Sequence, residues 1–288
     1  MTKILRCVTV LTIVAFATAS IALAQTYTTI DYPGATATTL DGGPNPEGTN
    51  IGTWTDTAGV THGFVLKDGV FTSFDPPRST ATTPNWISPQ GVIVGGYVDS
   101  TGANHGFVLD NWHYTTVDFP GAAGTILTGL NPSGEMAGAS CTVPSCPATS
   151  LHSFTVSKNR VFTGFDPPGA VSSNAASINP AGAVVGAYRD SRGVGHGYLL
   201  YRGTFATSDY PGATFTFAGA NNPAGVIVGL WTDTSGASHS FVLNHGVFRS
   251  FDFPGATLTD AAGINPAGII VGVYLDSSGV AHGFIRTQ

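Results

Sequence analysis

Six histidines recur along the chain, each followed by Gly or Ser and then by Phe or Tyr. Successive histidines are separated by 43, 47, 44, 43 and 43 residues. They are His62, His105, His152, His196, His239 and His282. Because histidine binds metals and transfers protons near neutral pH, these residues are the first candidates for chemistry in the sequence.

Aspartates accompany the histidines in two motifs. The motif D-x-P-x-x begins at Asp31, Asp75, Asp118, Asp166, Asp209 and Asp252. The motif D-x-x-G-x-x-H begins at Asp56, Asp99, Asp190, Asp233 and Asp276. The third repeat lacks the second motif and carries Cys141 and Cys146 instead. Carboxylates and imidazoles gathered on one rim could attract cations, calcium among them.

A structural role explains the same residues more simply. An Asp that opens a turn accepts backbone N–H bonds, and a neighbouring His can donate to it. A residue present in every repeat serves what every repeat needs. The loops lack the alternating carboxylates of a calcium loop, and one His per repeat does not form a zinc site. We therefore interpret these Asp and His residues as structural turn residues and expect no metal and no cofactor.

An aromatic residue stands two positions before the turn Asp in five repeats. These residues are Trp54, Tyr97, Tyr188, Trp231 and Tyr274, and in the third repeat Ser140 or a neighbour fills the position. Large amphipathic rings commonly pack between structural units, and they also stack on sugars or peptide side chains. Packing is the simpler explanation, but these five residues are the best binding candidates in the sequence.

The motif [NS]-P-x-G, which is typical of a type I turn, completes a unit of about 43 residues. In the fifth repeat, strand-like runs cover residues 214–220, 226–232, 239–243 and 247–252, and no window favours a long amphipathic helix. Six four-stranded antiparallel units of this size predict an all-β fold, a six-bladed β-propeller. A linear solenoid is the alternative, but it requires atypical capping repeats, which the sequence lacks.

The two ends of the repeat array complement each other. Residues 27–31 match the fourth strand of a unit, whereas residues 282–285 match the third strand of the last unit. We therefore expect the N-terminal strand to pair in the last blade and to close the ring. In such blades alternate turns emerge on opposite faces, so both Asp motifs and the histidines should share one face.

The repeated H-G-F, D-x-P-G-A and N-P-x-G motifs resemble those of the HAF repeat family of bacterial extracellular repeat proteins. The resemblance covers residues 27–288. It implies secretion, and it implies no particular reaction.

Residues 1–24 have the features of a secretory signal peptide. Lys3 and Arg6 precede an apolar run that ends in Ala22-Leu23-Ala24. Residues 25–288 then form the single propeller domain, which we expect to be secreted to the periplasm or outside the cell. In that oxidising environment a disulfide between Cys141 and Cys146 is predicted. A formal charge of −6 argues against nucleic acid as a partner, and no later apolar run reaches the length of a membrane span.

The sequence contains no catalytic motif of the types G-x-S-x-G or H-E-x-x-H. The non-repeated acids are expected mostly in or near turns of the other face and do not suggest a paired general acid and base; they are Asp41, Glu47, Asp68, Asp110, Glu135 and Asp260. Four further residues are peculiar to single repeats and are interpreted as incidental: Trp112, His113, Arg189 and Arg192.

The sequence thus favours a monomeric, non-catalytic binding or structural module whose ligand is a glycan or a protein. A hydrolase or lyase with its site in the central channel is the alternative, and it depends on fold analogy alone.

Overall fold

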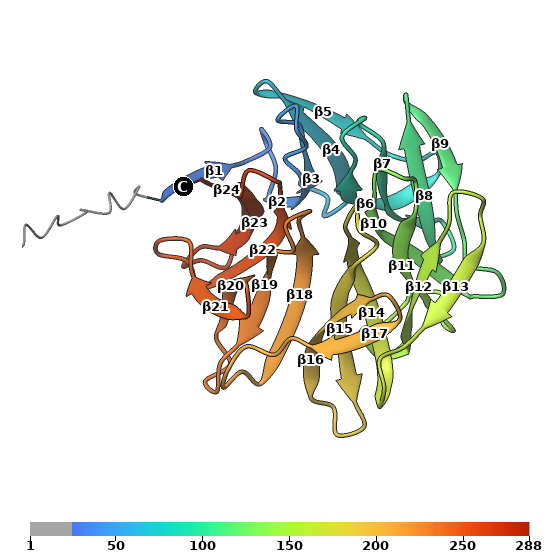
Figure 1. Cartoon of the computed structure of the whole chain (residues 1–288). Helices are drawn as coiled ribbons and strands as arrows, with labels where there is room; N and C mark the ends of the chain where they lie inside the picture. The colour runs from blue at the N-terminus through green and yellow to red at the C-terminus, as the bar shows by residue number, and fades with distance from the viewer. Residues whose placement is uncertain (1–24, 288) are drawn as a thin grey trace, which may run out of the picture.

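The computed structural model describes residues 25–287, and the predicted signal peptide lies outside this range. Within it the chain forms twenty-four β-strands and one short 3-10 helix, η1 (Ala148–Ser150). Figure 1 shows the strands arranged in successive sheets around a common centre. This is the all-β, strand-rich architecture that the sequence predicts.

The first three repeats each form a separate four-stranded sheet. The first sheet contains β2 (Ala37–Gly42), β3 (Asn50–Thr55), β4 (Thr61–Lys67) and β5 (Val70–Phe74). The second contains β6 (Ser79–Ile87), β7 (Ile93–Asp99), β8 (Asn104–Asp110) and β9 (His113–Thr116). The third contains β10 (Gly124–Leu130), β11 (Met136–Cys141), β12 (Leu151–Val156) and β13 (Phe162–Phe165).

The other strands belong to one twelve-stranded sheet. The fourth repeat supplies β14 (Ala170–Ile178), β15 (Val184–Asp190), β16 (Gly195–Tyr201) and β17 (Thr204–Thr207). The fifth supplies β18 (Phe215–Asn221), β19 (Ile227–Thr232), β20 (Ser238–Asn244) and β21 (Val247–Phe251). The sixth supplies β22 (Leu258–Ile264), β23 (Ile270–Leu275) and β24 (Ala281–Thr287), which β1 (Thr26–Ile30) joins.

This large sheet differs from the six separate blades expected from the sequence. Its three repeats are joined at two places, where parallel strands pair through one residue pair each. These pairs are Gly195 with Phe215 and Ser238 with Leu258. At the first junction a side chain on Gly195 would lie 2.0 Å from a ring carbon of Phe215. The absence of that side chain permits the close approach, which residue periodicity alone does not reveal.

The N-terminal strand occupies the place predicted for it. β1 pairs antiparallel with β24, from Thr26 opposite Thr287 to Ile30 opposite Gly283. Both figures of the whole chain show this strand beside the C-terminal strand. The last repeat therefore completes its four strands with a segment from the other end of the chain.

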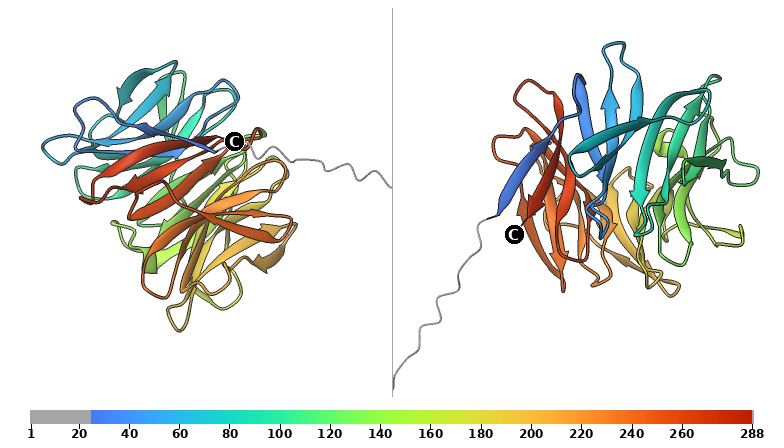
Figure 2. Two further views of the ribbon diagram at one scale, coloured as in Figure 1. Left: turned by 90° about the vertical axis from the view of Figure 1, so that its left-hand side faces the viewer. Right: turned by 90° about the horizontal axis from the view of Figure 1, so that it is seen from above.

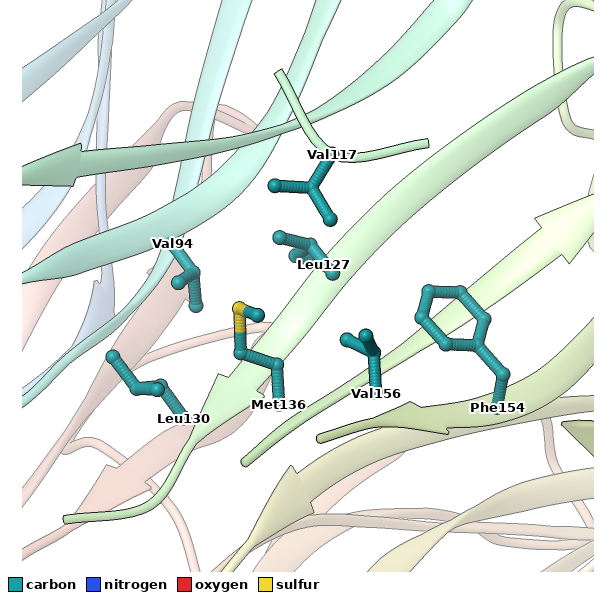
Figure 3. Packing of buried hydrophobic residues seen from close by; sticks show 7 residues of the cluster. All are labelled: Val94, Val117, Leu127, Leu130, Met136, Phe154 and Val156. Carbon is teal, nitrogen blue, oxygen red and sulfur yellow. The ribbon is translucent and has the colours of Figure 1, made fainter. Parts of the chain in front are cut away.

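The hydrophobic core lies between neighbouring repeats. The aromatic residue that follows His-Gly or His-Ser is almost fully buried in every repeat: Phe64, Phe107, Phe154, Tyr198, Phe241 and Phe284. Figure 3 shows one such cluster, in which Val94 of the second repeat packs with Leu127, Met136 and Phe154 of the third. Burial of apolar area between sheets is what holds such units together, at about 25 cal/mol per Å².

The [NS]-P-x-G turns of all six repeats, called N-P-x-G turns below, line one small cavity of about 90 Å³. Each repeat contributes a proline to it: Pro46, Pro89, Pro132, Pro180, Pro223 and Pro266. The side chain of Asn179 caps its own turn with Oδ1 and donates from Nδ2 to the carbonyl of Asn222 in the next repeat (3.3 Å). This asparagine thus stabilises both its own turn and the contact between repeats.

Candidate functional site

At the other end of the repeats, each histidine contacts the Asp of the D-x-P motif. The distances from Nδ1 to the carboxylate are 2.7 Å for His62–Asp75 and His196–Asp209, 2.8 Å for His105–Asp118 and His282–Asp31, 2.9 Å for His239–Asp252 and 3.0 Å for His152–Asp166. Each bond ties the third strand of a repeat to the segment that leaves its fourth strand.

The other ring nitrogen faces the Asp of the D-x-x-G turn in five repeats. The Nε2–Oδ2 distances run from 3.4 Å for His105–Asp99 to 3.8 Å for His196–Asp190. His62 lies between two carboxylates in this way, and its pKa is raised because their attraction outweighs the opposing effect of burial. His152 has no second Asp, as expected from the missing motif in the third repeat.

The turn aspartates also hold their own loops. Oδ1 of Asp99 accepts from the hydroxyl of Thr101 and from the backbone N–H groups of Thr101 and Ala103. These hydrogen bonds lower the pKa of Asp99 to about 2. Within residues 25–287 no group of three or more His, Cys, Asp or Glu side chains is arranged to hold a metal ion. The hydrogen bonds of Asp99 are those of a turn cap.

Each of the five aromatic binding candidates packs against the histidine ring of its own repeat, with ring centroids 4.6 to 5.1 Å apart. Three have a second ring on the opposite side: Trp54 stacks on Tyr32, Trp231 on Tyr210 and Tyr274 on Phe253. Four donate or share a hydrogen bond with the outer strand of their repeat, at Ser73, Thr116, Ser250 and Thr29.

Tyr188 differs from the other four aromatic residues. Its hydroxyl has no hydrogen-bond partner among the described residues, and, as for Tyr97, no second ring stacks on it there. Its ring instead borders a cavity of about 200 Å³, here called the junction cavity, between the fourth and fifth repeats. The junction cavity is lined by Ala148, Leu151, Ser172, Ser173, Asn174, Ala187, Tyr188, Arg189, Phe215 and Phe217. It lies at the end of the repeats that carries the Asp and His motifs.

Three lining residues of the junction cavity depart from the repeat pattern. Arg189 precedes the turn Asp, where other repeats have Thr55, Val98, Thr232 and Leu275. Phe215 replaces Ala, Gly, Ser or Leu on the innermost strand, and Phe217 replaces Thr, Ile, Asn or Asp. The Arg189 guanidinium lies 5.5 Å from the centre of the Phe215 ring and donates from Nη1 to the carbonyl of Gly193 (3.1 Å). A cation and two aromatic rings are thus gathered at one junction.

The cysteine loop lies beside this cavity. Cys141 and Cys146 form a disulfide, and η1, which follows the loop, supplies Ala148 to the lining. The backbone carbonyl of Pro144 accepts from the backbone and side chain of Asn104 in the second repeat. The four-residue insertion in the third repeat therefore has a fixed place at the edge of the site.

Two of the non-repeated acids, expected from the sequence mostly in or near turns, lie on inner strands and interact with each other. Asp41 and Asp260 lie on β2 and β22, the inner strands of the first and last repeats. Burial raises the pKa of Asp41 to about 7, and repulsion from Asp260 adds to the rise. Burial also raises the pKa of Asp260 to about 6, and its Oδ1 has no hydrogen-bond partner within the described chain. Neither residue borders the cavity of the N-P-x-G turns.

The repeat motifs alone indicate an incidental role for Arg189 and no role for Phe215 or Phe217. The signal was available in the repeats themselves: residues that break the pattern at neighbouring positions of adjoining repeats. Detecting it requires knowing that the end of β15 lies against the start of β18, which the structure provides.

Several solved structures are similar to this chain. A putative TolB from Agrobacterium tumefaciens has a TM-score of 0.59 at 12% identity, over 87% of this chain and 90% of its own. A lectin of Aleuria aurantia, described as a six-bladed β-propeller that recognises fucose, has a TM-score of 0.55 at 13% identity, over 88% and 91%. A virginiamycin B lyase from Staphylococcus aureus, solved with quinupristin, has a TM-score of 0.56 at 11% identity, over 92% and 100%.

These similarities identify the fold as a β-propeller and, at such low identity, carry nothing further. No family model matches the sequence. No curated protein matches it either. Between residues 25 and 287 there is no helix long and apolar enough to cross a membrane.

Proposed function

We propose that this protein is a secreted, non-catalytic glycan-binding β-propeller of the HAF repeat type, in which six blades form a closed ring. Pairing of β1 with β24 supports the closure, as does the cavity lined by the turns of all six repeats. The disulfide between Cys141 and Cys146 fits an oxidising compartment outside the cytoplasm.

The junction cavity is the observation that carries this proposal. Aromatic rings bury the apolar face of a sugar, while hydroxyl, amide and guanidinium groups bond its hydroxyls. Tyr188, Phe215 and Phe217 offer the first kind of surface, and Arg189 and Asn174 the second. A volume of about 200 Å³ suits one sugar ring rather than a long oligosaccharide, because sites for drug-sized ligands are roughly 300–1,000 Å³.

The fold similarity to a fucose-binding lectin agrees with this proposal without naming the sugar. A hydrolase or lyase remains the alternative through fold similarity to the virginiamycin B lyase. The cavity near the N-P-x-G turns is lined by Asn, Pro, Gly, Trp, Leu and Ile residues and by no titratable side chain. We therefore favour binding over catalysis.

A thermal-shift screen of the purified protein against monosaccharides tests the proposal. A ligand at about 100 times its Kd stabilises the folded state by about 2.7 kcal/mol, which raises Tm by roughly 5–10 °C in a domain of this size. We expect one class of sugar to give this shift. The substitutions Arg189→Thr and Phe217→Thr, which restore residues found in other repeats, should abolish it.

Arg192→Thr is the matched control. Arg192 is an exposed arginine three positions away that pairs with Asp190 (2.8 Å) and does not line the junction cavity. Its substitution should leave the shift intact. A shift that survives both Arg189→Thr and Phe217→Thr would place the sugar elsewhere and refute this site.

A further inference from the structure

A third cavity, larger than the two described above, lies between the fifth and sixth repeats, at the end that carries the N-P-x-G turns. Its volume is about 560 Å³, and it is called here the arginine groove. Its walls come from the N-P-x-G turns, from β20 and β21, and from Arg286 on β24. The residues that line it include Arg249 and Arg286 but no Asp or Glu. In a chain with a formal charge of −6, this is a local excess of positive charge.

Arg286 occupies a position that is aliphatic in the other five repeats. The corresponding position two residues after the buried aromatic is occupied in the other repeats by Leu66, Leu109, Val156, Leu200 and Leu243. Arg286 is nevertheless buried, with only 5% of its surface exposed. Burying a charged group is costly unless a partner compensates it.

Within the described residues, the charge of the Arg286 guanidinium is only partly compensated. Nε of Arg286 donates to Oε1 of Gln25 (3.3 Å), and the guanidinium lies 4.3 Å from the centre of the Phe251 ring. Among residues 25–287 no carboxylate lies within ion-pairing distance of this guanidinium, as the ion pairs of that range show. A guanidinium has five N–H donors arranged to bind a carboxylate or similar oxyanion with two parallel bonds. Most of that capacity is available to a ligand.

Arg249 adds a second, exposed cation to the same wall. It lies opposite Val242 in the pairing of β20 with β21. The corresponding residues of the other outer strands are Thr28, Thr72, Thr115, Thr163 and Ala206. Both arginines therefore depart from the repeat at one junction, so the requirements of a blade do not explain them.

We propose that the arginine groove binds a saccharide that carries a carboxylate, such as a uronic-acid oligosaccharide. The carboxylate accepts from Arg286, while Arg249 contributes the charge at the rim. Phe251 and Val247 offer apolar surface to a sugar ring, and Asn244 offers an amide to its hydroxyls. A volume of about 560 Å³ is within the roughly 300–1,000 Å³ of organic-ligand sites and far exceeds what a bare anion needs. This inference does not depend on the junction cavity.

Titration calorimetry with the galacturonic acid trimer tests the proposal, with the galactose trimer as the neutral counterpart. We expect the acidic trimer to bind and the neutral trimer to bind at least about tenfold more weakly. Added salt should lower the affinity for the acidic trimer. Arg286→Leu and Arg249→Thr restore the residues of other repeats, and each should weaken binding at least about tenfold. Arg202→Asn, which removes an exposed hairpin arginine outside the groove, should leave affinity unchanged.

Thermal unfolding without ligand separates a binding role from a structural one. Arg286→Leu should raise Tm, because an aliphatic side chain at this buried position removes an uncompensated charge. No binding of the acidic trimer, or undiminished binding by Arg286→Leu, would overturn the proposal. If sulfate binds as tightly as the trimer at equal ionic strength, the ligand is not a saccharide. A marked fall in Tm for Arg286→Leu would show that Arg286 has a structural role.

Discussion

At the scale of single residues, the repeated polar side chains and the residues that break the repeat have different uses. Asp99 accepts hydrogen bonds from the backbone of its own turn and lies 3.4 Å from Nε2 of His105, and the equivalent aspartates hold their turns and face their histidines in four other repeats. Their side chains form hydrogen bonds within the repeat and so stabilise local structure. Arg189 and Arg286, by contrast, lie where other repeats have no charge, and both line cavities.

The carboxyl groups of Asp41 and Asp260 give the fold a distinct pH dependence. Their pKa values, about 7 and about 6, lie above that of an unfolded Asp, so the folded state keeps protons that the unfolded chain releases. Stability is then lost as pH rises from about 4 through 7, and the full penalty is present above pH 7.

The substitution Asp41→Asn removes the part of this penalty that comes from Asp41. We expect its free energy of unfolding to exceed that of the unmodified protein by about 1–3 kcal/mol at pH 8, with the difference vanishing near pH 4. Urea unfolding at the two pH values measures this. Asp68→Asn removes an exposed hairpin carboxylate and should show no such difference. An Asp41→Asn protein that is less stable than the unmodified protein at pH 8 would contradict the assignment.

At the scale of elements, the strands and turns follow from local sequence. The ends of the four runs predicted in the fifth repeat lie within one residue of the ends of β18, β19, β20 and β21. The Asn-Pro-x-Gly turns form as predicted, with Asn222 Oδ1 accepting from the backbone of Ala224 and Val226 (3.0 Å each). Such signals are readable because a turn is determined by four neighbouring residues.

The N-terminal strand permits a sharper test of the architecture. Deleting residues 25–30 leaves β24 without its outer partner and removes Ile30 from its core cluster. An exposed strand edge and the lost apolar contacts should lower Tm by roughly 10 °C, or about 3 kcal/mol. A peptide of residues 25–34 added in excess should restore part of the loss. Unchanged thermal unfolding of the shortened chain would show that β1 does not stabilise the fold.

At the scale of the whole molecule, the sequence predicted what every repeat shares and missed what pairs of repeats create. The repeat period predicted the propeller, and the two matching ends predicted the pairing of β1 with β24. The twelve-stranded sheet and both cavities depend on contacts between adjoining repeats, such as that of Gly195 with Phe215. A repeat pattern reports the residues that all repeats share. It therefore does not predict contacts made by residues that differ at a single junction.

The asymmetry of the repeats leads to a quantitative expectation about ligand number. The five aromatic candidates recur around the molecule, whereas Arg189, Phe215 and Phe217 meet at a single junction. A binding site made by the repeated aromatic residues would occur about once per repeat. A binding site made by the junction cavity occurs once per chain.

The stoichiometry of sugar binding is therefore the most direct test of the proposed function. Titration calorimetry with the monosaccharide that stabilises the protein should give one bound sugar per chain and no binding by Phe217→Thr. A stoichiometry near five, unaffected by Phe217→Thr and reduced by Trp54→Ala and Trp231→Ala, would contradict this account and assign binding to the repeated aromatic residues.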